Sequence, residues 1–322
     1  MKHHFADLLE RSFEYWTIAP NRERWACHFP DLDEAPIDSH RLTITRNDKN
    51  WQRLRELPAL ADLTLHEPDQ SQLAALADFP KLTALRISHA RPKTLAMIEG
   101  LTNLRELVLE YVSGVSDLGP IGRLPSLRAL HLENLRRVSD FSGLGASKSL
   151  RYVAIFGTLD WSQPIESFDF LRSMDSLEHL NLGFGVRVPN APFVFNSLLG
   201  HKKLARLEIG MATLPLEKYA WLEAKLPHLE GTVRPAFARS GGGGARQLEA
   251  DDYRTKMPLT EFQRFPLLFE GKDGKRYEKI PHEAILLGKG QRIVSGTDEH
   301  VTAKCAEHEE KYRALVASYQ EQ

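Results

Sequence analysis

The chain has little of what marks several common classes of protein. Its 322 residues include only two cysteines, Cys27 and Cys305, which are too few for a disulfide framework. No apolar run approaches the roughly 20 residues that a membrane-spanning helix needs. Asp7, Glu10 and Glu14 interrupt the segment where a signal peptide has its apolar core. We therefore expect a cytoplasmic protein that does not contact a membrane.

An excess of charge of one sign is also missing. Lys and Arg number 42 against 43 Asp and Glu, so the formal net charge is -1. Domains that hold nucleic acid by its phosphates carry a basic excess, and we therefore expect no nucleic acid as a partner. At 36.5 kDa the chain is long for one compact core, which favours one elongated domain or two globular ones.

Leucine at a fixed spacing is what the sequence has in abundance. A Leu-x-x-Leu-x-x-Leu-x-Leu pattern recurs, and its third positions lie 22, 22, 23, 23, 27 and 27 residues apart. The Leu-x-Leu pair alternates with period two, which predicts a short strand with one buried face. Such a unit cannot bury its apolar face alone, so neighbouring repeats must stack. The third positions are Leu63, Leu85, Leu107, Leu130, Val153, Leu180 and Leu207, with weaker copies around Leu42 and Ile44 and around Leu229, Thr232 and Val233.

From about residue 40 to residue 234 this pattern resembles the leucine-rich-repeat family. Val115-Ser116-Asp117-Leu118, echoed by Val138-Ser139-Asp140-Phe141, resembles the 22-residue class of bacterial internalins and eukaryotic protein-phosphatase regulators. The resemblance implies an α/β solenoid, a horseshoe with a parallel β-sheet on its concave face, and it favours a bacterial protein. The family's turn asparagine is missing, which predicts a less regular solenoid. Its positions hold Pro68, Ala90, Val112, Leu135, Gly185 and Ala212.

Segments of different composition flank the repeats. We expect residues 1–38 to form a helical N-terminal cap, because the end of a solenoid needs a polar cover. The solenoid then spans 39–234, and a glycine-rich stretch places a flexible linker at 235–257. The predicted cap carries an apolar stripe at helical spacing, made of Phe5, Leu8, Leu9, Phe13 and Trp16.

Residues 258–322 predict a small α+β appendage. Two hairpins with glycine turns are expected over 265–280 and 284–294, followed by a helix over 299–320. This helix carries one apolar seam, which favours packing on the hairpins, with self-association through the helix as the alternative. The seam consists of Val301, Cys305, His308, Tyr312, Leu315 and Tyr319.

Cys305 and His308 are the strongest candidates for chemistry in the chain. They lie three residues apart on one helix face, with His282 and His300 upstream. Zinc needs three or four protein ligands, and this appendage offers one thiol. No nucleophile elbow, zinc-protease pair or kinase set appears in the sequence. We therefore expect no catalytic residue, metal or cofactor, and the alternative is a metal-binding or enzymatic protein with its site in the appendage.

The concave face of the predicted sheet is the expected binding surface for a partner protein. Glu110 and Glu133 hold equivalent positions on neighbouring strands, about 4.8 Å apart, with Tyr152 and Phe156 next to them. Acidic side chains beside exposed aromatic rings predict a contact for a protein with a basic surface. The competing interpretation turns Phe156 inward and leaves the glutamates solvated. The predicted contacts on this face are Arg86, Glu106, Glu110, His131, Glu133, Tyr152, Phe156, Asn181 and Glu208.

The two 27-residue repeats carry extra residues after their strands, at 158–164 and 186–192. Insertions in a solenoid map to one face and often to the binding side. Trp161 and Arg187 are therefore added to the predicted contacts. Together these features predict a protein-interaction module, and a narrower interpretation is an inhibitor or neutraliser of an enzyme or toxin.

Overall fold

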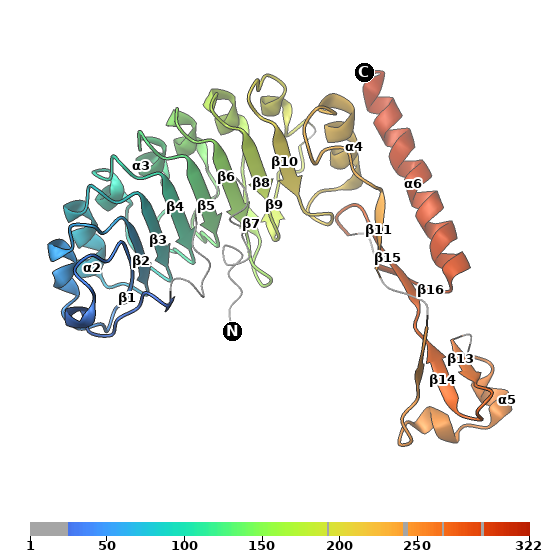
Figure 1. Cartoon of the computed structure of the whole chain (residues 1–322). Helices are drawn as coiled ribbons and strands as arrows, with labels where there is room; N and C mark the ends of the chain where they lie inside the picture. Colours follow the sequence, from blue (N-terminus) through green and yellow to red (C-terminus); the bar gives the residue numbers. More distant parts are fainter. Residues whose placement is uncertain (1–24, 192, 241–243, 266, 291–292) are drawn as a thin grey trace. The chain divides into compact units, whose positions relative to one another are not determined.

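The computed structural model describes residues 25–191, 193–240, 244–265, 267–290 and 293–322. The chain divides into two compact units (Figure 1). The repeat unit contains the described residues up to Thr213 together with Leu226–Thr232, and the C-terminal unit contains Leu214–Lys225 together with the described part of Val233–Gln322.

An eight-stranded parallel sheet runs through the repeat unit, with one strand from each repeat. The strands follow the chain order, and the equivalent leucines of neighbouring repeats pair in register, as Leu63 does with Leu85 and Leu85 with Leu107. The prediction of a solenoid with a parallel sheet is confirmed. The strands are β1 (Arg41–Thr45), β2 (Asp62–His66), β3 (Ala84–Ser88), β4 (Glu106–Glu110), β5 (Ala129–Glu133), β6 (Tyr152–Phe156), β8 (His179–Leu182) and β10 (Arg206–Ile209).

Short helical turns return the chain from each strand to the next and form the other wall of the coils (Figure 1). The strand leucines pack between the two walls, where Leu107, Leu130 and Leu180 are completely buried. Each such burial contributes about 1.5–3 kcal/mol to folding. The turns are η2 (Leu32–Glu34), η3 (Trp51–Glu56), α2 (Gln70–Ala74), η4 (Ala75–Asp78), η5 (Ala96–Ile98), α3 (Gly119–Gly122), η6 (Ser142–Ala146), η7 (Asp169–Ser173) and η8 (Asn196–Leu198).

The residue after each of four consecutive strands adopts a left-handed backbone conformation. Glu67, His89, Tyr111 and Asn134 have φ values of 50°, 56°, 54° and 56°. Each backbone N–H donates to the carbonyl of the last residue of the next strand, at 2.9 to 3.1 Å. The sheet is therefore extended by one hydrogen bond per coil, and these four side chains are left in a row along its edge.

Apolar side chains occupy the positions of the missing turn asparagines. Ala90, Val112 and Leu135 are each at most 1% exposed, so they fill the turn by packing. In one coil the buried side chain of Gln163 takes over the hydrogen bonds. Its Oε1 accepts from the Leu135 N–H at 3.0 Å, and its Nε2 donates to the Val138 carbonyl at 2.7 Å.

The insertions of the two longest repeats pair with each other. β7 (Gln163–Pro164) and β9 (Val186–Arg187) form a separate two-stranded parallel sheet. The extra residues therefore build a small ordered element after β6 and β8, and they are not two independent loops.

The C-terminal unit contains two three-stranded antiparallel sheets and two longer helices. One sheet has the order β11-β15-β16 and the other β12-β14-β13. The predicted hairpins are β13 with β14 and β15 with β16. The elements are α4 (Leu216–Lys225), β11 (Phe237–Ser240), β12 (Ala245–Gln247), η9 (Tyr253–Lys256), α5 (Leu259–Phe262), β13 (Leu268–Glu270), β14 (Arg276–Lys279), β15 (His282–Leu286), β16 (Ile293–Gly296) and α6 (Asp298–Gln320).

The structure places the boundary between the parts of the chain differently from the expectation. Helix α4, expected inside the 39–234 solenoid, packs against α6 in the C-terminal unit. The expected linker 235–257 contains β11 and β12, whose partners β15 and β14 come about 30 to 50 residues later. The glycine-rich composition suggests a linker there, because composition does not show that β11 and β12 pair with strands far along the chain. Most of the predicted cap, residues 1–24, lies outside the described residues.

Helix α6 begins at Asp298, where the Thr297 hydroxyl accepts from the His300 N–H, and ends at Gln320. Its buried residues are those of the predicted seam up to Tyr312, but the seam then continues through Val316 instead of Leu315. Among the described residues, no helix is long and apolar enough to cross a membrane.

A buried carboxylate joins the two helices of the C-terminal unit. The hydroxyl of Tyr312 donates to Glu223 at 2.6 Å, and Arg313 binds the other carboxylate oxygen at 2.5 Å. Glu223 is 7% exposed and Tyr312 is fully buried. Burial, followed by the hydrogen bond and charge of Glu223, raises the pKa of Tyr312 well above its usual value.

We predict that Glu223→Ala destabilises the C-terminal unit by about 1–3 kcal/mol, because the buried Tyr312 hydroxyl then lacks its acceptor. Denaturant unfolding followed by circular dichroism measures the change. The matched control is Glu307→Ala on helix α6, which removes an exposed pair with Lys304 and should leave the stability almost unchanged. Equal losses in the two variants would contradict the role of the Glu223 contact.

Candidate functional site

Arg86 and Glu110 form a buried ion pair on the concave face of the sheet. Arg86 Nε donates to Glu110 Oε2 at 2.6 Å, and a second bond from Nη2 to Oε1 makes the pair bidentate. The side chains are 4% and 0% exposed. Because Arg86 neutralises Glu110, the neighbouring glutamates are not the repelling pair that the sequence suggests.

Glu133 has its own neighbour on the same strand. His131 Nε2 lies 3.4 Å from Glu133 Oε2, and both side chains are completely buried. The His131 ring stacks on Phe156 with centroids 5.1 Å apart, and Tyr152 meets His179 edge-on at 4.6 Å. The middle of the concave face is therefore a packed cluster of charged and aromatic side chains, named here the concave cluster: Arg86, Glu110, His131, Glu133, Tyr152, Phe156 and His179.

The expectation of exposed aromatic rings and glutamates on this face is wrong. Glu110, His131, Glu133 and Tyr152 are 0% exposed, and Phe156 is 9% exposed. Strand alternation assigns these side chains to the concave face, but it does not tell how closely they pack against one another. Because Arg86 already neutralises Glu110, this buried pair offers little attraction to a basic partner. Of the predicted contacts on the sheet, Glu106, Asn181 and Glu208 remain partly exposed.

Glu208 lies on β10, the last strand of the sheet, next to His179 of the concave cluster. It accepts a hydrogen bond from Asn181 at 2.6 Å, and Arg206 lies 2.5 Å away. His179, followed by Arg206, lowers the pKa of Glu208 against the opposing effect of burial. Glu208 is therefore an anionic acceptor at neutral pH, held in place by three neighbours.

A groove of about 990 Å³ lies where the chain leaves the strands. It extends from the residue after β1 to the insertion that follows β6, and we call it the rim groove. Its lining residues are Arg46, Glu67, Pro68, Asp69, Gln70, His89, Ala90, Arg91, Tyr111, Ser113, Asn134, Arg136, Thr158, Leu159 and Asp160.

An aromatic row borders the same edge of the sheet. Trp25 contacts His66, His66 contacts His89, and His89 stacks on Tyr111 with centroids 4.7 Å apart and planes at 19°. Burial, followed by the charge of Glu133, raises the pKa of Tyr111. The residues of this aromatic row are absent from the predicted contacts. Two of them, His89 and Tyr111, belong to the row of left-handed residues, whose members Glu67, His89, Tyr111 and Asn134 recur at the repeat spacing of 22, 22 and 23 residues.

The insertions carry the exposed apolar side chains of this region. Leu159, Phe184 and Phe193 are 64%, 50% and 52% exposed. Of the two predicted contacts here, Arg187 is exposed and Trp161 is half-buried, and the backbone N–H of Trp161 donates to the Thr158 hydroxyl. Leu159 and Phe184 lie on the segments that precede β7 and β9, the strands of the insertion sheet, and Leu159 also lines the rim groove.

The architecture consists of one strand in each repeat of 22 to 27 residues, with equivalent leucines paired in register. Short helical turns form the wall opposite the strands. The chain has a leucine-rich-repeat fold.

Solved structures similar to this leucine-rich-repeat chain include two internalins of Listeria monocytogenes. Internalin inlF shares 22% identity over 56% of this chain and 50% of its own, with a TM-score of 0.41. Internalin C2 shares 19% identity over 51% and 67%, with a TM-score of 0.37. TLR13 in its complex with ssRNA13 shares 17% over 57% and 37%, with a TM-score of 0.28. The chain thus spans half the length of the first of these proteins.

No family model matches the sequence. No curated protein matches it either.

Cys305 and His308 lie inside the core of the C-terminal unit. Cys305 is 1% exposed and packs with Ala284 and Val301, while His308 Nε2 donates to the Leu287 carbonyl at 2.9 Å. Within the described ranges, no group of three or more His, Cys, Asp or Glu side chains is placed to hold a metal ion. Burial raises the pKa of the Cys305 thiol, which disfavours the thiolate that a nucleophile needs.

We predict that Glu110→Gln destabilises the repeat unit by about 3–5 kcal/mol, because it leaves the Arg86 charge buried without its counter-ion. Thermal and denaturant unfolding measure the loss. Replacing both partners, as Arg86→Met with Glu110→Leu, should restore most of the stability, and the exposed-pair variant Asp78→Ala should lose under about 1 kcal/mol. A loss in Glu110→Gln no larger than in Asp78→Ala would contradict a buried ion pair.

We also predict that Cys305 reacts with an aromatic disulfide reagent only when the protein unfolds, because its thiol is buried and its pKa is raised. The half-exposed Cys27 should account for the fast-reacting thiol of the native protein. Comparing Cys27→Ser with Cys305→Ser assigns each phase. Disappearance of the fast phase in Cys305→Ser would revive a reactive thiol in the C-terminal unit.

Proposed function

We propose that this protein is a binding module for a partner protein, and that the partner contacts the insertion sheet and the neighbouring surface of the concave sheet. The exposed apolar side chains Leu159, Phe184 and Phe193 carry this proposal. Apolar groups gathered on one surface and bordered by polar residues are typical of protein-interaction sites. A solenoid also holds such a surface rigidly, since each coil is anchored by its neighbours.

The predicted contacts divide into two groups in this proposal. Glu106, Asn181 and Glu208 on the sheet and Trp161 and Arg187 on the insertions are accessible to a partner. The concave cluster is buried, so it packs the strands together and offers a partner little exposed surface. Binding energy in such interfaces concentrates on a few aromatic and Arg anchors, which makes Trp161 the predicted contact to vary first, together with the exposed Phe184.

A narrower form of the proposal is that binding inhibits or neutralises an enzyme or toxin, because a concave surface can cover a partner's active site. We place this activity in the cytoplasm. Two cysteines in 322 residues are too few for a disulfide framework, and this low number suits a reducing compartment.

The test is an affinity capture from a lysate of the native host with the wild type and the double variant Trp161→Ala/Phe184→Ser. We expect a protein that the wild type retains and the double variant loses, because the substitutions remove the apolar anchors. Phe265→Ser is the matched control, since Phe265 is 45% exposed in the C-terminal unit. Circular dichroism verifies that all three proteins fold.

Retention of the same protein by the double variant would move the interface away from the insertion sheet. Loss of that protein in Phe265→Ser would assign the interface to the C-terminal unit instead. Adding the captured protein's own activity assay tests the narrower form, in which the wild type lowers the activity and the double variant does not.

A further inference from the structure

We infer that the rim groove binds an extended acidic segment of the partner protein. The inference builds on the proposed function, since it names the chemistry of one part of that partner. It concerns a surface separate from the insertion aromatics, although Leu159 and Asp160 mark the end of the groove nearest to them.

The length of the groove suits an extended chain. Its lining residues follow six consecutive strands, β1 to β6, and each coil adds about 4.8 Å. Five such steps span roughly 24 Å, which is the length of about seven residues of extended peptide. The groove runs across the strand direction along the row of left-handed residues, so one peptide meets every coil in turn.

Charge is distributed unevenly along the groove. The acidic lining residues lie at its ends, with Glu67 and Asp69 after β2 and Asp160 after β6. Hydrogen bonds from Ser71 and Gln72, with the charge of Arg46, hold the pKa of Asp69 low and occupy its carboxylate. The lining residues that follow β3, β4 and β5 contain no acidic side chain.

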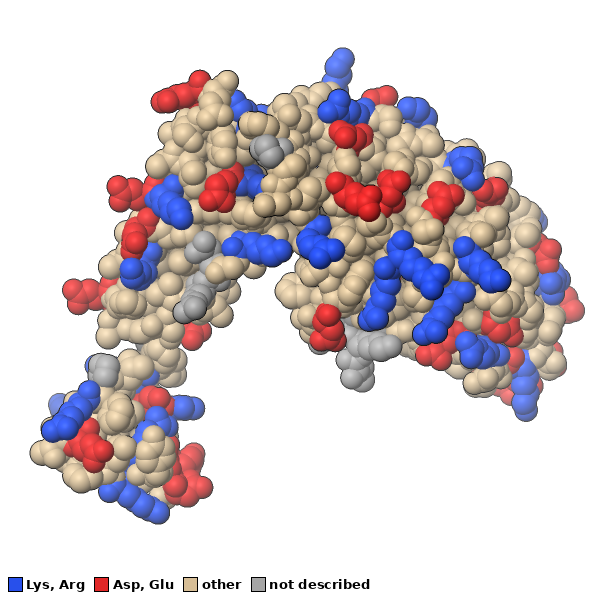
Figure 2. Space-filling model, turned by 180° about the vertical axis from the view of Figure 1, so that it is seen from behind, with Lys and Arg blue, Asp and Glu red and all other residues tan. Residues whose placement is uncertain are grey.

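Two arginines give this central stretch its positive charge. Arg91 and Arg136 are exposed, and neither forms an ion pair within the part of the chain that the structure describes. Figure 2 shows Lys and Arg side chains gathered on one face of the repeat unit. Between these arginines in the chain lies Tyr111, stacked on His89. Carboxylates spaced along a peptide can pair with each guanidinium in turn, and such pairs are the stronger kind of hydrogen bond.

A peptide fits this arrangement better than a nucleic acid. A phosphate backbone carries one charge per nucleotide and would meet Glu67 and Asp160 at the two ends of the groove. A peptide carries charge only at chosen side chains, so it can present carboxylates at the centre alone. The formal net charge of -1 also offers no long-range attraction for a polyanion.

The test measures fluorescence polarisation with three labelled nine-residue probes on the full chain. One peptide carries Glu at its two central alternate positions and Gly elsewhere, a second carries Lys at the same two positions, and the third probe is a thymidine oligonucleotide. We expect binding of the Glu peptide that weakens as salt rises, because the contacts are charged. The Lys peptide and the oligonucleotide should bind at least about tenfold more weakly.

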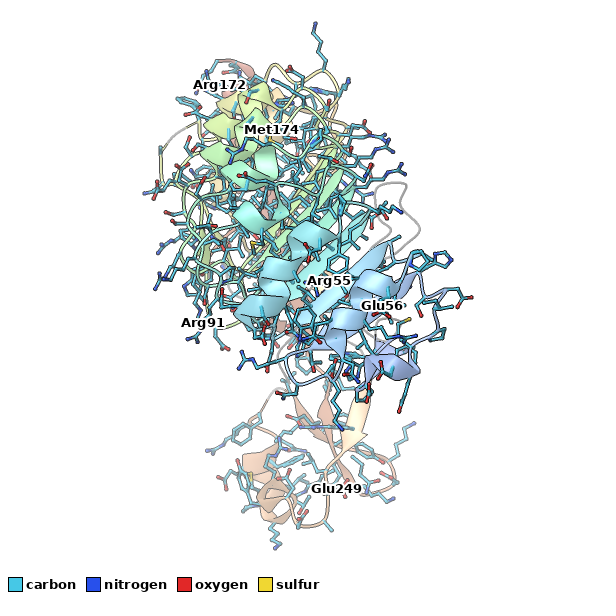
Figure 3. The ribbon with its side chains drawn as sticks, turned by 90° about the vertical axis from the view of Figure 1, so that its left-hand side faces the viewer. Arg55, Glu56, Arg91, Arg172, Met174 and Glu249 are labelled. Carbon is cyan, nitrogen blue, oxygen red and sulfur yellow. The ribbon has the colours of Figure 1, made fainter. Side chains whose placement is uncertain are left out.

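The variant Arg91→Glu/Arg136→Glu should weaken binding of the Glu peptide at least about tenfold. The matched control is Arg55→Glu/Arg172→Glu, because these arginines are also exposed and lie away from Arg91 in Figure 3. The control should leave binding unchanged. Equal binding by the two peptides, tighter binding by the oligonucleotide, or equal losses in the two variants would each overturn the inference.

The insertion variant Trp161→Ala/Phe184→Ser separates this inference from the proposed function. It should keep its affinity for the Glu peptide while losing the captured partner. If the partner is captured as proposed but the Glu peptide fails to bind, the inference fails and the proposed function stands. If the peptide binds but no partner depends on the insertions, the proposed function fails and the groove remains an acidic-segment site.

Discussion

No single coil of this chain can bury its own leucines, and the rest of the repeat unit follows from that constraint. Each strand carries two inward aliphatic side chains, most of them leucine, and needs neighbouring strands to exclude water from them. Stacking in register satisfies this need and places equivalent residues of every repeat at equal intervals. The concave cluster, the row of left-handed residues and the rim groove are all products of that repetition.

Repetition also creates problems of charge, which the side chains then resolve locally. Placing Glu110 beside Glu133 would be unfavourable if both remained unpaired and buried. Arg86 reaches Glu110 diagonally from the preceding strand, and His131 lies two residues before Glu133 on its own strand. The concave face is therefore held by the Arg86–Glu110 ion pair and by the hydrogen bond between His131 and Glu133. This makes it a rigid support more than a collection of independent contact residues.

The backbone architecture could be predicted because it depends on spacing, while the site depends on contacts that spacing does not encode. The leucine period places all eight strands, and the seam through Val301, Cys305, His308 and Tyr312 places helix α6. Arg86 and Glu110 lie 24 residues apart in the sequence, and their pairing requires a diagonal contact between neighbouring strands. The union of β11 with β15 likewise depends on long-range pairing, so composition alone suggests a linker at that point.

The signal for the rim groove was present in the sequence but lay one residue beyond the strand pattern. Glu67, His89, Tyr111 and Asn134 repeat with the leucines, and a left-handed conformation is uncommon for residues other than glycine. The conformation persists in this row because each of these residues donates its N–H to the next coil. Stacking that buries the leucines thus also keeps four polar or aromatic side chains at the edge of the sheet. In a repeat protein, the positions just after the strand are therefore as informative about a binding surface as those within it.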